Sequence, residues 1–157
     1  MLRTFTRVSP RVRVMAASAA LSTSPLQTVA TDGAPAAIGP YSQAVVCNGT
    51  VYVSGMLGLV PGDGKGFAGD SVGEQTRQAL ENMKSVLEAA GSSLSCVAKT
   101  TVLMTDMANY GAINEVYSEF FGGDSKPARA AFAVKGLPAD ALVEIDAVAC
   151  LSSSDRS

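Results

Sequence analysis

Arg129 is the residue whose surroundings most clearly need a chemical explanation. It stands in the segment 126–134, where nearly every neighbour is small or apolar. A guanidinium group in such surroundings needs an anionic partner, and arginine can grip a carboxylate through two parallel hydrogen bonds. A small organic acid is therefore a natural ligand. A surface arginine at a strand entrance, or one in a structural ion pair, would give the same pattern.

Two carboxylates lie close together near the end of the chain. Glu144 and Asp146 alternate with Val143, Ile145 and Ala147, so both acids should project from the same side of a strand. Paired acids become catalytic candidates where a cleft shifts their pKa values. Solvated polar residues on an edge strand produce the same alternation, and spacing leaves both interpretations open.

Three further positions could line a pocket. Tyr41 follows Gly39-Pro40, an irregular backbone that could aim its ring toward a cavity, and Asn114 falls on a predicted helix. Ser54 precedes a glycine inside a strand pattern, which indicates a β-bulge or a close approach of the backbone to a ligand. Ordinary packing or solvation would explain each of these residues equally well.

The sequence excludes several kinds of chemistry. It has no histidine, and its three cysteines, Cys47, Cys96 and Cys150, form no C-x-x-C pair. We therefore expect no metal site and no Ser-His or Cys-His nucleophile pair. The glycines near Ser54 lack the order of a phosphate-binding loop, and no cofactor is expected. Catalysis would have to use carboxylates, tyrosine, arginine, backbone groups and water.

Hydrophobic periodicity and turn residues predict an α+β domain with two helices. Asn48-Gly49 is a two-residue hairpin signal, Ser71 and Glu74 can form a capping box, and Asp106 is placed to cap the second helix. The predicted order is strands at 44–47 and 50–57, a helix from 72 to 90, a strand at 97–104, a helix ending before 122–123, and strands at 128–134 and 142–150.

A sheet of these strands has two faces, and both helices should lie on one of them. The other face must meet solvent or a partner subunit. Its strands are rich in valine, leucine, methionine and alanine, and a large exposed apolar surface usually marks an interface. The pattern therefore predicts an oligomer.

The first 31 residues differ in composition from the rest. They contain Arg3, Arg7, Arg11 and Arg13, nine Ser or Thr residues, and no acid before Asp32. This is typical of an organelle transit peptide, although a disordered basic tail would look alike. The segment 14–17 resembles the cleavage motif of plastid transit peptides, so a chloroplast is favoured over a mitochondrion. We predict a leader at 1–31 and a domain at 32–157.

The predicted domain carries an acidic charge. Of the 12 lysines and arginines four lie in the leader, which leaves 8 against 14 acids and a formal charge of −6. Nucleic acid is therefore not an expected partner. No apolar run approaches the roughly 20 residues that a membrane-spanning helix needs, so we expect a soluble protein with no membrane contact.

Taken in order, these segments resemble the Rid (YjgF) family of reactive-intermediate deaminases. The resemblance covers about residues 34 to 151 and rests on the segments Ala34–Ala44, Val53–Gly55, Lys99–Val102, Asn114–Tyr117, Pro127–Arg129 and Val143–Ala147. It implies a chorismate-mutase-like α+β fold and a homotrimer whose sheets form an inner barrel. Active sites would then lie in the clefts between subunits.

The resemblance also implies roles for individual residues. Arg129 matches the arginine that holds the substrate carboxylate, and Glu144 matches the acid that positions or activates the hydrolytic water. Tyr41, Ser54 and Asn114 match pocket-lining positions, and the backbone at Ala131 would contact the substrate nitrogen. The implied activity is metal-independent hydrolysis of 2-iminobutanoate and 2-iminopropanoate to 2-oxo acids and ammonia.

This chain departs from the family pattern at two positions, Met56 and Ala131, where many members have glutamine and some bacterial members have cysteine. Both changes bear on substrate range. Three other functions stay open: a non-catalytic trimer that binds small ligands, an endoribonuclease or translation inhibitor, and a holdase-like chaperone. The missing histidine and the acidic domain speak against the ribonuclease.

Overall fold

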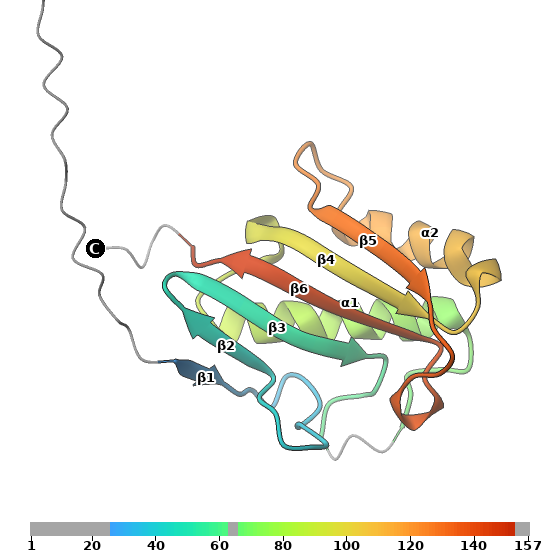
Figure 1. The fold of residues 1–157 in the computed structure, drawn as a ribbon, viewed down its shortest axis with the longest axis horizontal. Helices are drawn as coiled ribbons and strands as arrows, with labels where there is room; N and C mark the ends of the chain where they lie inside the picture. The colour runs from blue at the N-terminus through green and yellow to red at the C-terminus, as the bar shows by residue number, and fades with distance from the viewer. Residues whose placement is uncertain (1–25, 63–65, 153–157) are drawn as a thin grey trace, which may run out of the picture.

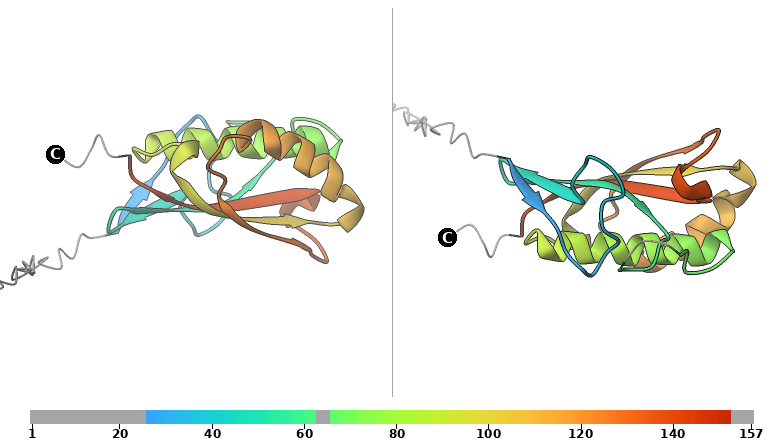
Figure 2. Two further views of the ribbon diagram at one scale, coloured as in Figure 1. Left: turned by 90° about the horizontal axis from the view of Figure 1, so that it is seen from above. Right: turned by 90° about the horizontal axis from the view of Figure 1, so that it is seen from below.

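The computed structural model describes residues 26–62 and 66–152, which form a six-stranded sheet with two helices on one face (Figures 1 and 2). This confirms the predicted α+β fold. The strands are β1 (Gln27–Val29), β2 (Ala44–Cys47), β3 (Thr50–Leu57), β4 (Val97–Met104), β5 (Ala128–Ala133) and β6 (Val143–Cys150), and the helices are α1 (Val72–Ala89) and α2 (Tyr110–Phe120). Short 3-10 turns are η1 (Leu94–Cys96), η2 (Met107–Asn109) and η3 (Pro138–Asp140).

The strand order across the sheet is β1-β2-β3-β6-β4-β5. Neighbouring strands are antiparallel except β4 and β5, which are parallel, so the sheet is mixed as predicted. The last strand, β6, is therefore an interior strand. This corrects one interpretation of Glu144 and Asp146, because polar residues on β6 are not explained by a solvated sheet edge.

Local signals in the sequence explain two of the boundaries. Asn48 and Gly49 adopt φ angles of 50° and 76° between β2 and β3, which is the left-handed conformation that a two-residue hairpin turn requires. At the start of α1, the Ser71 hydroxyl accepts from the Glu74 backbone N–H, and the Glu74 carboxylate accepts from the Ser71 N–H. Both predictions are confirmed, and such a cap stabilises a helix by about 1 kcal/mol.

The start of the second helix differs from the prediction. Asp106 accepts a hydrogen bond from the Ala108 N–H at 2.9 Å and so caps the 3-10 turn η2. The helix α2 follows at Tyr110 and has no side-chain cap of its own. A capping residue near a helix start satisfies whichever backbone N–H groups turn toward it, and here a tighter turn comes first.

The strand β1 was not predicted, and it lies inside the range 1–31 that we assigned to the leader. Its residues Gln27–Val29 pair with β2 through Ala44–Val46. Three residues are too few to show a periodic pattern, and pairing with β2 is what makes them a strand. The rest of the predicted leader, residues 1–25, lies outside the described residues.

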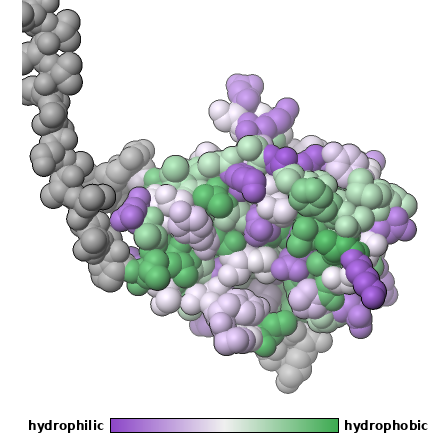
Figure 3. Space-filling model, in the orientation of Figure 1, coloured by the Kyte–Doolittle hydropathy of each residue, from purple (hydrophilic) through white to green (hydrophobic). Residues whose placement is uncertain are grey.

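The hydrophobic core lies between the sheet and the two helices. The buried side of α1 contributes Leu80, Met83, Val86 and Leu87, which are fully buried against the sheet. The opposite sheet face is open in one chain, and Figure 3 shows hydrophobic patches there among hydrophilic residues. Tyr52 and Phe132 are 51% and 56% exposed on it. In the described part of the chain, neither helix is long and apolar enough to cross a membrane.

Candidate active site

A β-bulge in β3 creates the first half of the site. The pairing of β3 with β6 shifts between Val53 and Met56, so Ser54 and Gly55 together lie opposite the single residue Asp146. This confirms the bulge that the glycine in the strand pattern predicted. The bulge turns Ser54 away from regular pairing and places Gly55 beside Glu144.

Ser54 holds the loop that carries Tyr41. Its hydroxyl donates to the Ser42 carbonyl at 2.6 Å, and its backbone N–H donates to the Gln43 carbonyl at 3.0 Å. The hydroxyl proton of the predicted pocket residue Ser54 is thus used in a hydrogen bond within the protein and is not available to a ligand. It can still accept a hydrogen bond, and the loop it holds borders the same pocket.

Gly55 makes room for the Glu144 carboxylate. A Cβ atom built at position 55 would overlap Glu144 Oε1, so an alanine there would have to displace the carboxylate. The close approach of backbone to ligand that the glycine suggested is therefore, in this structure, an approach of backbone to an acidic side chain. A side chain at position 55 and Glu144 in this place exclude one another.

The environment of Glu144 changes its protonation. Desolvation by burial raises the pKa of its carboxyl above the ordinary 4.5, and the charge of Asp146 on the same sheet face raises it further. Asp146 is fixed in place because its Oδ1 accepts the Thr101 backbone N–H at 3.0 Å. Glu144 is therefore an acid that exchanges its proton more readily near neutral pH than an ordinary glutamate.

A cavity of about 400 Å³ opens at the Glu144 carboxylate, and its lining includes the predicted residues Tyr41 and Ser54. Apolar side chains of Ile38, Leu57 and Pro138 form much of the remaining wall. Apolar walls exclude water from the carboxylate, which agrees with the desolvation that raises its pKa.

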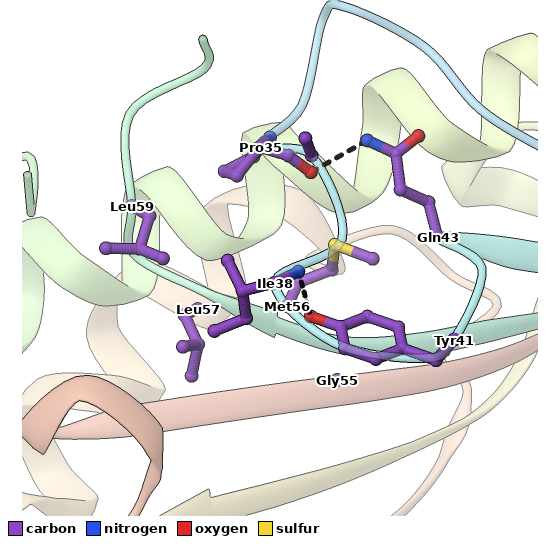
Figure 4. Close-up of a pocket in the computed structure, with 9 residues that line it drawn as sticks. Pro35, Ile38, Tyr41, Gln43, Gly55, Met56, Leu57 and Leu59 are labelled. Carbon is purple, nitrogen blue, oxygen red and sulfur yellow. Dashed lines mark hydrogen bonds between the residues drawn. The ribbon is translucent and has the colours of Figure 1, made fainter. Parts of the chain in front are cut away.

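The loop over this cavity is tied down by Gln43, a residue that the sequence analysis missed. Its amide nitrogen donates to the carbonyls of Pro35 and Thr31, and its amide oxygen accepts the Thr31 N–H at 2.7 Å. Figure 4 shows this contact with Pro35, and on the other side of the loop the Tyr41 hydroxyl, which accepts the Ile38 N–H at 3.3 Å. A glutamine between a Gly-Pro loop and an apolar strand is the sequence signal that could have found it.

Met56, one of the two departures from the family pattern, lies beneath this loop. It is buried and borders a small cavity of about 30 Å³ with Pro35 and Gln43 (Figure 4). It does not line the larger cavity at Glu144. An effect of Met56 on substrate range would therefore act through the position of the loop.

The second half of the site surrounds Arg129 on β5. Its Nη1 donates to Asn114 Oδ1 at 2.8 Å, and its Nη2 donates to the Tyr110 hydroxyl at 3.1 Å. The guanidinium carbon lies 4.7 Å from the ring centroid of Tyr117 and 5.7 Å from that of Tyr110. Asn114 and Arg129 were predicted site residues, and the structure brings them together.

Tyr110, Asn114 and Tyr117 of α2 form a cradle around the Arg129 side chain. Its two tyrosines were not predicted as site residues. Tyr110, Asn114 and Tyr117 are spaced at i, i+4 and i+7, so they share one face of α2. That spacing was visible in the sequence, but its partner on β5 was not. Tyr117 is anchored by a 2.8 Å hydrogen bond between its hydroxyl and Thr100 Oγ1, and burial raises the pKa of its phenol.

The electrostatics of this half favour an anion. Within residues 26–62 and 66–152, Arg129 forms no ion pair with an acidic side chain, and both hydrogen-bond partners named above are neutral. A cavity of about 330 Å³ beside it is lined by a second cation, Lys126, and by no acid. The positive charge of Arg129 is thus available to a ligand.

Ala131 follows Arg129 on the same strand, and its side chain is half-buried against the core. The Val134 N–H donates to the Met104 carbonyl on β4. Because backbone groups alternate in direction along a strand, the N–H and C=O of Ala131 turn toward the free edge of the sheet. The side chain at 131 therefore points away from the groups that a ligand could contact.

The two halves lie on opposite faces of the sheet. Arg129 pairs with Thr100, whose side chain reaches Tyr117 on the helix-covered face. Glu144 alternates with the buried Val143 and Ile145 and so points to the open face. The strand β4 separates them as well. Within one chain, Arg129 and Glu144 cannot contact the same small molecule.

Known proteins resemble this chain over most of its length. The family model described as endoribonuclease L-PSP matches residues 31–151. Reactive Intermediate Deaminase A, chloroplastic, of Arabidopsis thaliana is 46% identical over 80% of this chain and 66% of its own length. The 2-iminobutanoate/2-iminopropanoate deaminase of Mus musculus is 49% identical over 78% and 90%. The crystal structure of RidA from the Antarctic bacterium Psychrobacter superimposes with a TM-score of 0.75 at 42% identity, covering 80% of this chain and 99% of that one.

Proposed function

The chain belongs to the endoribonuclease L-PSP (Rid/YjgF) family, as its sequence predicted, and from this premise we propose that it hydrolyses 2-imino acids to 2-oxo acids and ammonia. 2-Iminobutanoate and 2-iminopropanoate are the proposed substrates, in line with the name of the mouse relative. The observation that carries the proposal is that the chain offers two complementary groups. The Arg129 guanidinium is held by neutral partners and can bind a carboxylate, and Glu144 is half-buried with a raised pKa.

The proposed reaction uses only groups of this chain and water. Arg129 binds the substrate carboxylate through two hydrogen bonds and fixes the position of C2. Ionised Glu144 takes a proton from water, whose oxygen attacks C2 of the imine to give a carbinolamine. Glu144 returns that proton to the imine nitrogen, which completes the carbinolamine. It then takes the proton of the carbinolamine hydroxyl and delivers it to the amine nitrogen, so C=O forms as the C–N bond breaks, and ammonia leaves a 2-oxo acid behind.

The raised pKa of Glu144 suits both of these steps. A carboxyl that exchanges its proton closer to neutral pH is a stronger base toward water and can still protonate the departing amine. The imine is already an activated electrophile, so positioning and one proton relay are sufficient chemistry. Tyr41, Ser54 and the backbone of Ala131 would border the substrate.

We further propose that each active site is shared between two copies in a homotrimer. Arg129 and Glu144 lie on opposite sheet faces, so a substrate that touches both must lie between chains. The open face carries exposed Tyr52 and Phe132, which an interface would cover. The exposed loop with Ile38 and Tyr41 lies beside Glu144 and would approach the partner together with it.

A complementation experiment tests this arrangement. Arg129→Ala and Glu144→Gln should each be inactive alone. If the two variants are mixed, unfolded and refolded together at equal amounts, random assortment gives about a quarter of the sites both native residues, and about a quarter of wild-type activity should return. Sites formed within single chains would recover none, and that result would overturn the shared site.

The activity itself is measured as release of ammonia and 2-oxobutanoate. A threonine dehydratase generates 2-iminobutanoate in place, and wild-type protein is compared with Arg129→Ala. Acceleration by the wild type alone supports the deaminase. Tight binding of 2-oxobutanoate without acceleration would instead favour a non-catalytic ligand-binding trimer.

The name of the family, endoribonuclease L-PSP, favours a second candidate, an endoribonuclease. The sequence without histidine and with an acidic domain gives this candidate little support. RNA cleavage by highly purified protein that disappears in Arg129→Ala would establish it, and cleavage that persists in that variant would identify a contaminant.

We also propose that residues before β1 target the protein to an organelle, with the chloroplast favoured over the mitochondrion. The support is the basic, hydroxyl-rich composition of this segment and the chloroplastic Arabidopsis relative. A fluorescent protein fused behind residues 1–26 should enter plastids. Entry into mitochondria would correct the compartment, and a cytosolic signal would overturn the targeting.

A further inference from the structure

Tyr110 is the tyrosine at the start of α2 that the proposed mechanism does not use. Its hydroxyl accepts the hydrogen bond from Arg129 Nη2 at 3.1 Å, and its ring lies 5.7 Å from the guanidinium carbon. The residue is 37% exposed, so the contact is made at the surface where a ligand can arrive. It is thus in direct contact with the group proposed to bind the substrate carboxylate.

The contacts of Arg129 divide the work of holding its side chain. Asn114 takes one N–H of Nη1, Tyr110 takes one N–H of Nη2, and the Tyr117 ring supports the guanidinium at 4.7 Å. Two hydrogen bonds on different nitrogens fix the rotation of the guanidinium plane, which one bond alone would leave free. Three of its five N–H groups remain for a ligand.

Both hydrogen-bond acceptors in the cradle are neutral. A carboxylate in the place of Tyr110 would hold the guanidinium as firmly, but it would cancel the positive charge and compete with the substrate carboxylate. A phenol restrains the orientation and leaves the charge intact. The cradle therefore fixes the orientation of the Arg129 guanidinium without neutralising its positive charge, which stays available to an anion.

We propose that Tyr110 is a positioning residue that pre-orients Arg129 for the carboxylate of the substrate. The inference rests on the proposed function for the identity of that substrate. Immobilising a long side chain costs binding about 0.5–1.5 kcal/mol, which corresponds to about 2- to 13-fold in affinity. The Tyr110 hydroxyl removes this cost before the ligand arrives.

The test separates the hydroxyl from the ring. Tyr110→Phe keeps the ring beside the guanidinium and removes only the hydrogen bond, whereas Tyr110→Leu removes both. We expect Tyr110→Phe to raise KM about 3- to 10-fold with kcat changed less than about twofold, and Tyr110→Leu to raise KM further. Ser85→Ala, which removes a hydroxyl on α1 that donates to the Glu81 carbonyl, should leave the kinetics unchanged.

A binding measurement distinguishes positioning from a general structural defect. Calorimetry should show that Tyr110→Phe weakens the binding of 2-oxobutanoate by the same factor by which it raises KM. The binding of the uncharged amide of 2-oxobutanoate should be unaffected. Equal weakening of both ligands would overturn the inference, and so would wild-type affinity for 2-oxobutanoate in the variant. These comparisons need no turnover, so their outcome is separate from failure of the wild type to accelerate imine hydrolysis.

Discussion

The two halves of the candidate site use opposite electrostatic strategies. Around Arg129, neutral groups of α2 hold a cation at the exposed edge of the sheet and leave its charge available. Around Glu144, apolar walls and a second acid surround a half-buried carboxylate on the interior strand β6. The surroundings of Arg129 preserve its positive charge, whereas the surroundings of Glu144 disfavour the negative charge of its carboxylate.

This contrast teaches how the proposed work is divided. A charge that binds a carboxylate must persist at every pH of use, which an arginine in neutral surroundings ensures. A group that moves protons must change its charge easily, which burial of a glutamate promotes. The two environments conflict, and their places on opposite sheet faces keep them apart within one chain. In the proposed oligomer a second copy would bring them together.

The largest effect is expected from Arg129→Ala. Loss of the cation leaves the substrate carboxylate unpaired, and removal of one partner of a charged pair costs about 2–5 kcal/mol, so kcat/KM should fall by about 30- to 5,000-fold. Sedimentation should show the same oligomer as the wild type. Arg77→Ala removes an exposed arginine paired with Glu119 on the helices and serves as the control. Dissociation or unfolding of the Arg129 variant would make Arg129 structural.

Gly55→Ala tests the other half without changing any charge. The new methyl group must push the Glu144 carboxylate away, and a misplacement of about 1 Å can cost about 100-fold in rate, so we expect a loss of about 10- to 100-fold in kcat. Gly73→Ala on α1, where the nearest atom is 3.9 Å from an added Cβ, is the matched control. Full activity of Gly55→Ala would show that the position of Glu144 does not matter.

Asp146→Asn should sharpen the contrast through pH. The amide can keep the hydrogen bond from Thr101 but loses the charge that helps to raise the pKa of Glu144. The pKa of Glu144 then falls toward its ordinary value, and the acidic limb of the kcat/KM profile should move to lower pH. Glu88→Gln, an exposed acid on α1, should leave the profile in place. A shift toward higher pH would contradict the assignment.

The smallest effect concerns stability in Glu144→Gln. A raised pKa means that the folded protein holds the Glu144 proton more tightly than the unfolded chain does. The stability this contributes is complete below the ordinary pKa of 4.5 and is lost as the pH rises through the folded value. Glutamine removes this loss, so thermal unfolding should show a small gain in stability at pH 7 and none at pH 4. An equal gain at both would exclude titration as the cause.

Sequence reasoning succeeded where a signal is local. The hairpin turn at Asn48-Gly49 and the capping box at Ser71 depend on neighbouring residues alone, and both are present. It failed where the answer depends on register across the sheet. The sheet faces of Arg129 and Glu144 follow from the pairing of β4 with β5 and β6, which no segment encodes by itself.

The candidate site shows the same division. The bulge at Ser54-Gly55 was visible as a glycine in a strand, but its function as space for Glu144 required the pairing of β3 with β6. Tyr110 was not predicted as a site residue, because its spacing of four residues from Asn114 also suits a solvated helix face. Family resemblance supplied Arg129 and Glu144 as a pair, and the structure places them on opposite faces of the sheet.

If residues before β1 are the proposed targeting leader, the pairing of β1 limits where that leader could be removed. Removal of the whole range 1–31 would delete β1 and Thr31, which binds the Gln43 side chain through both backbone groups. It would also leave β2 as a bare sheet edge, and bare edges recruit other strands. A protein trimmed ahead of Gln27 would keep β2 paired with β1, whereas one begun at Asp32 would expose the longer β2 edge and be prone to aggregate.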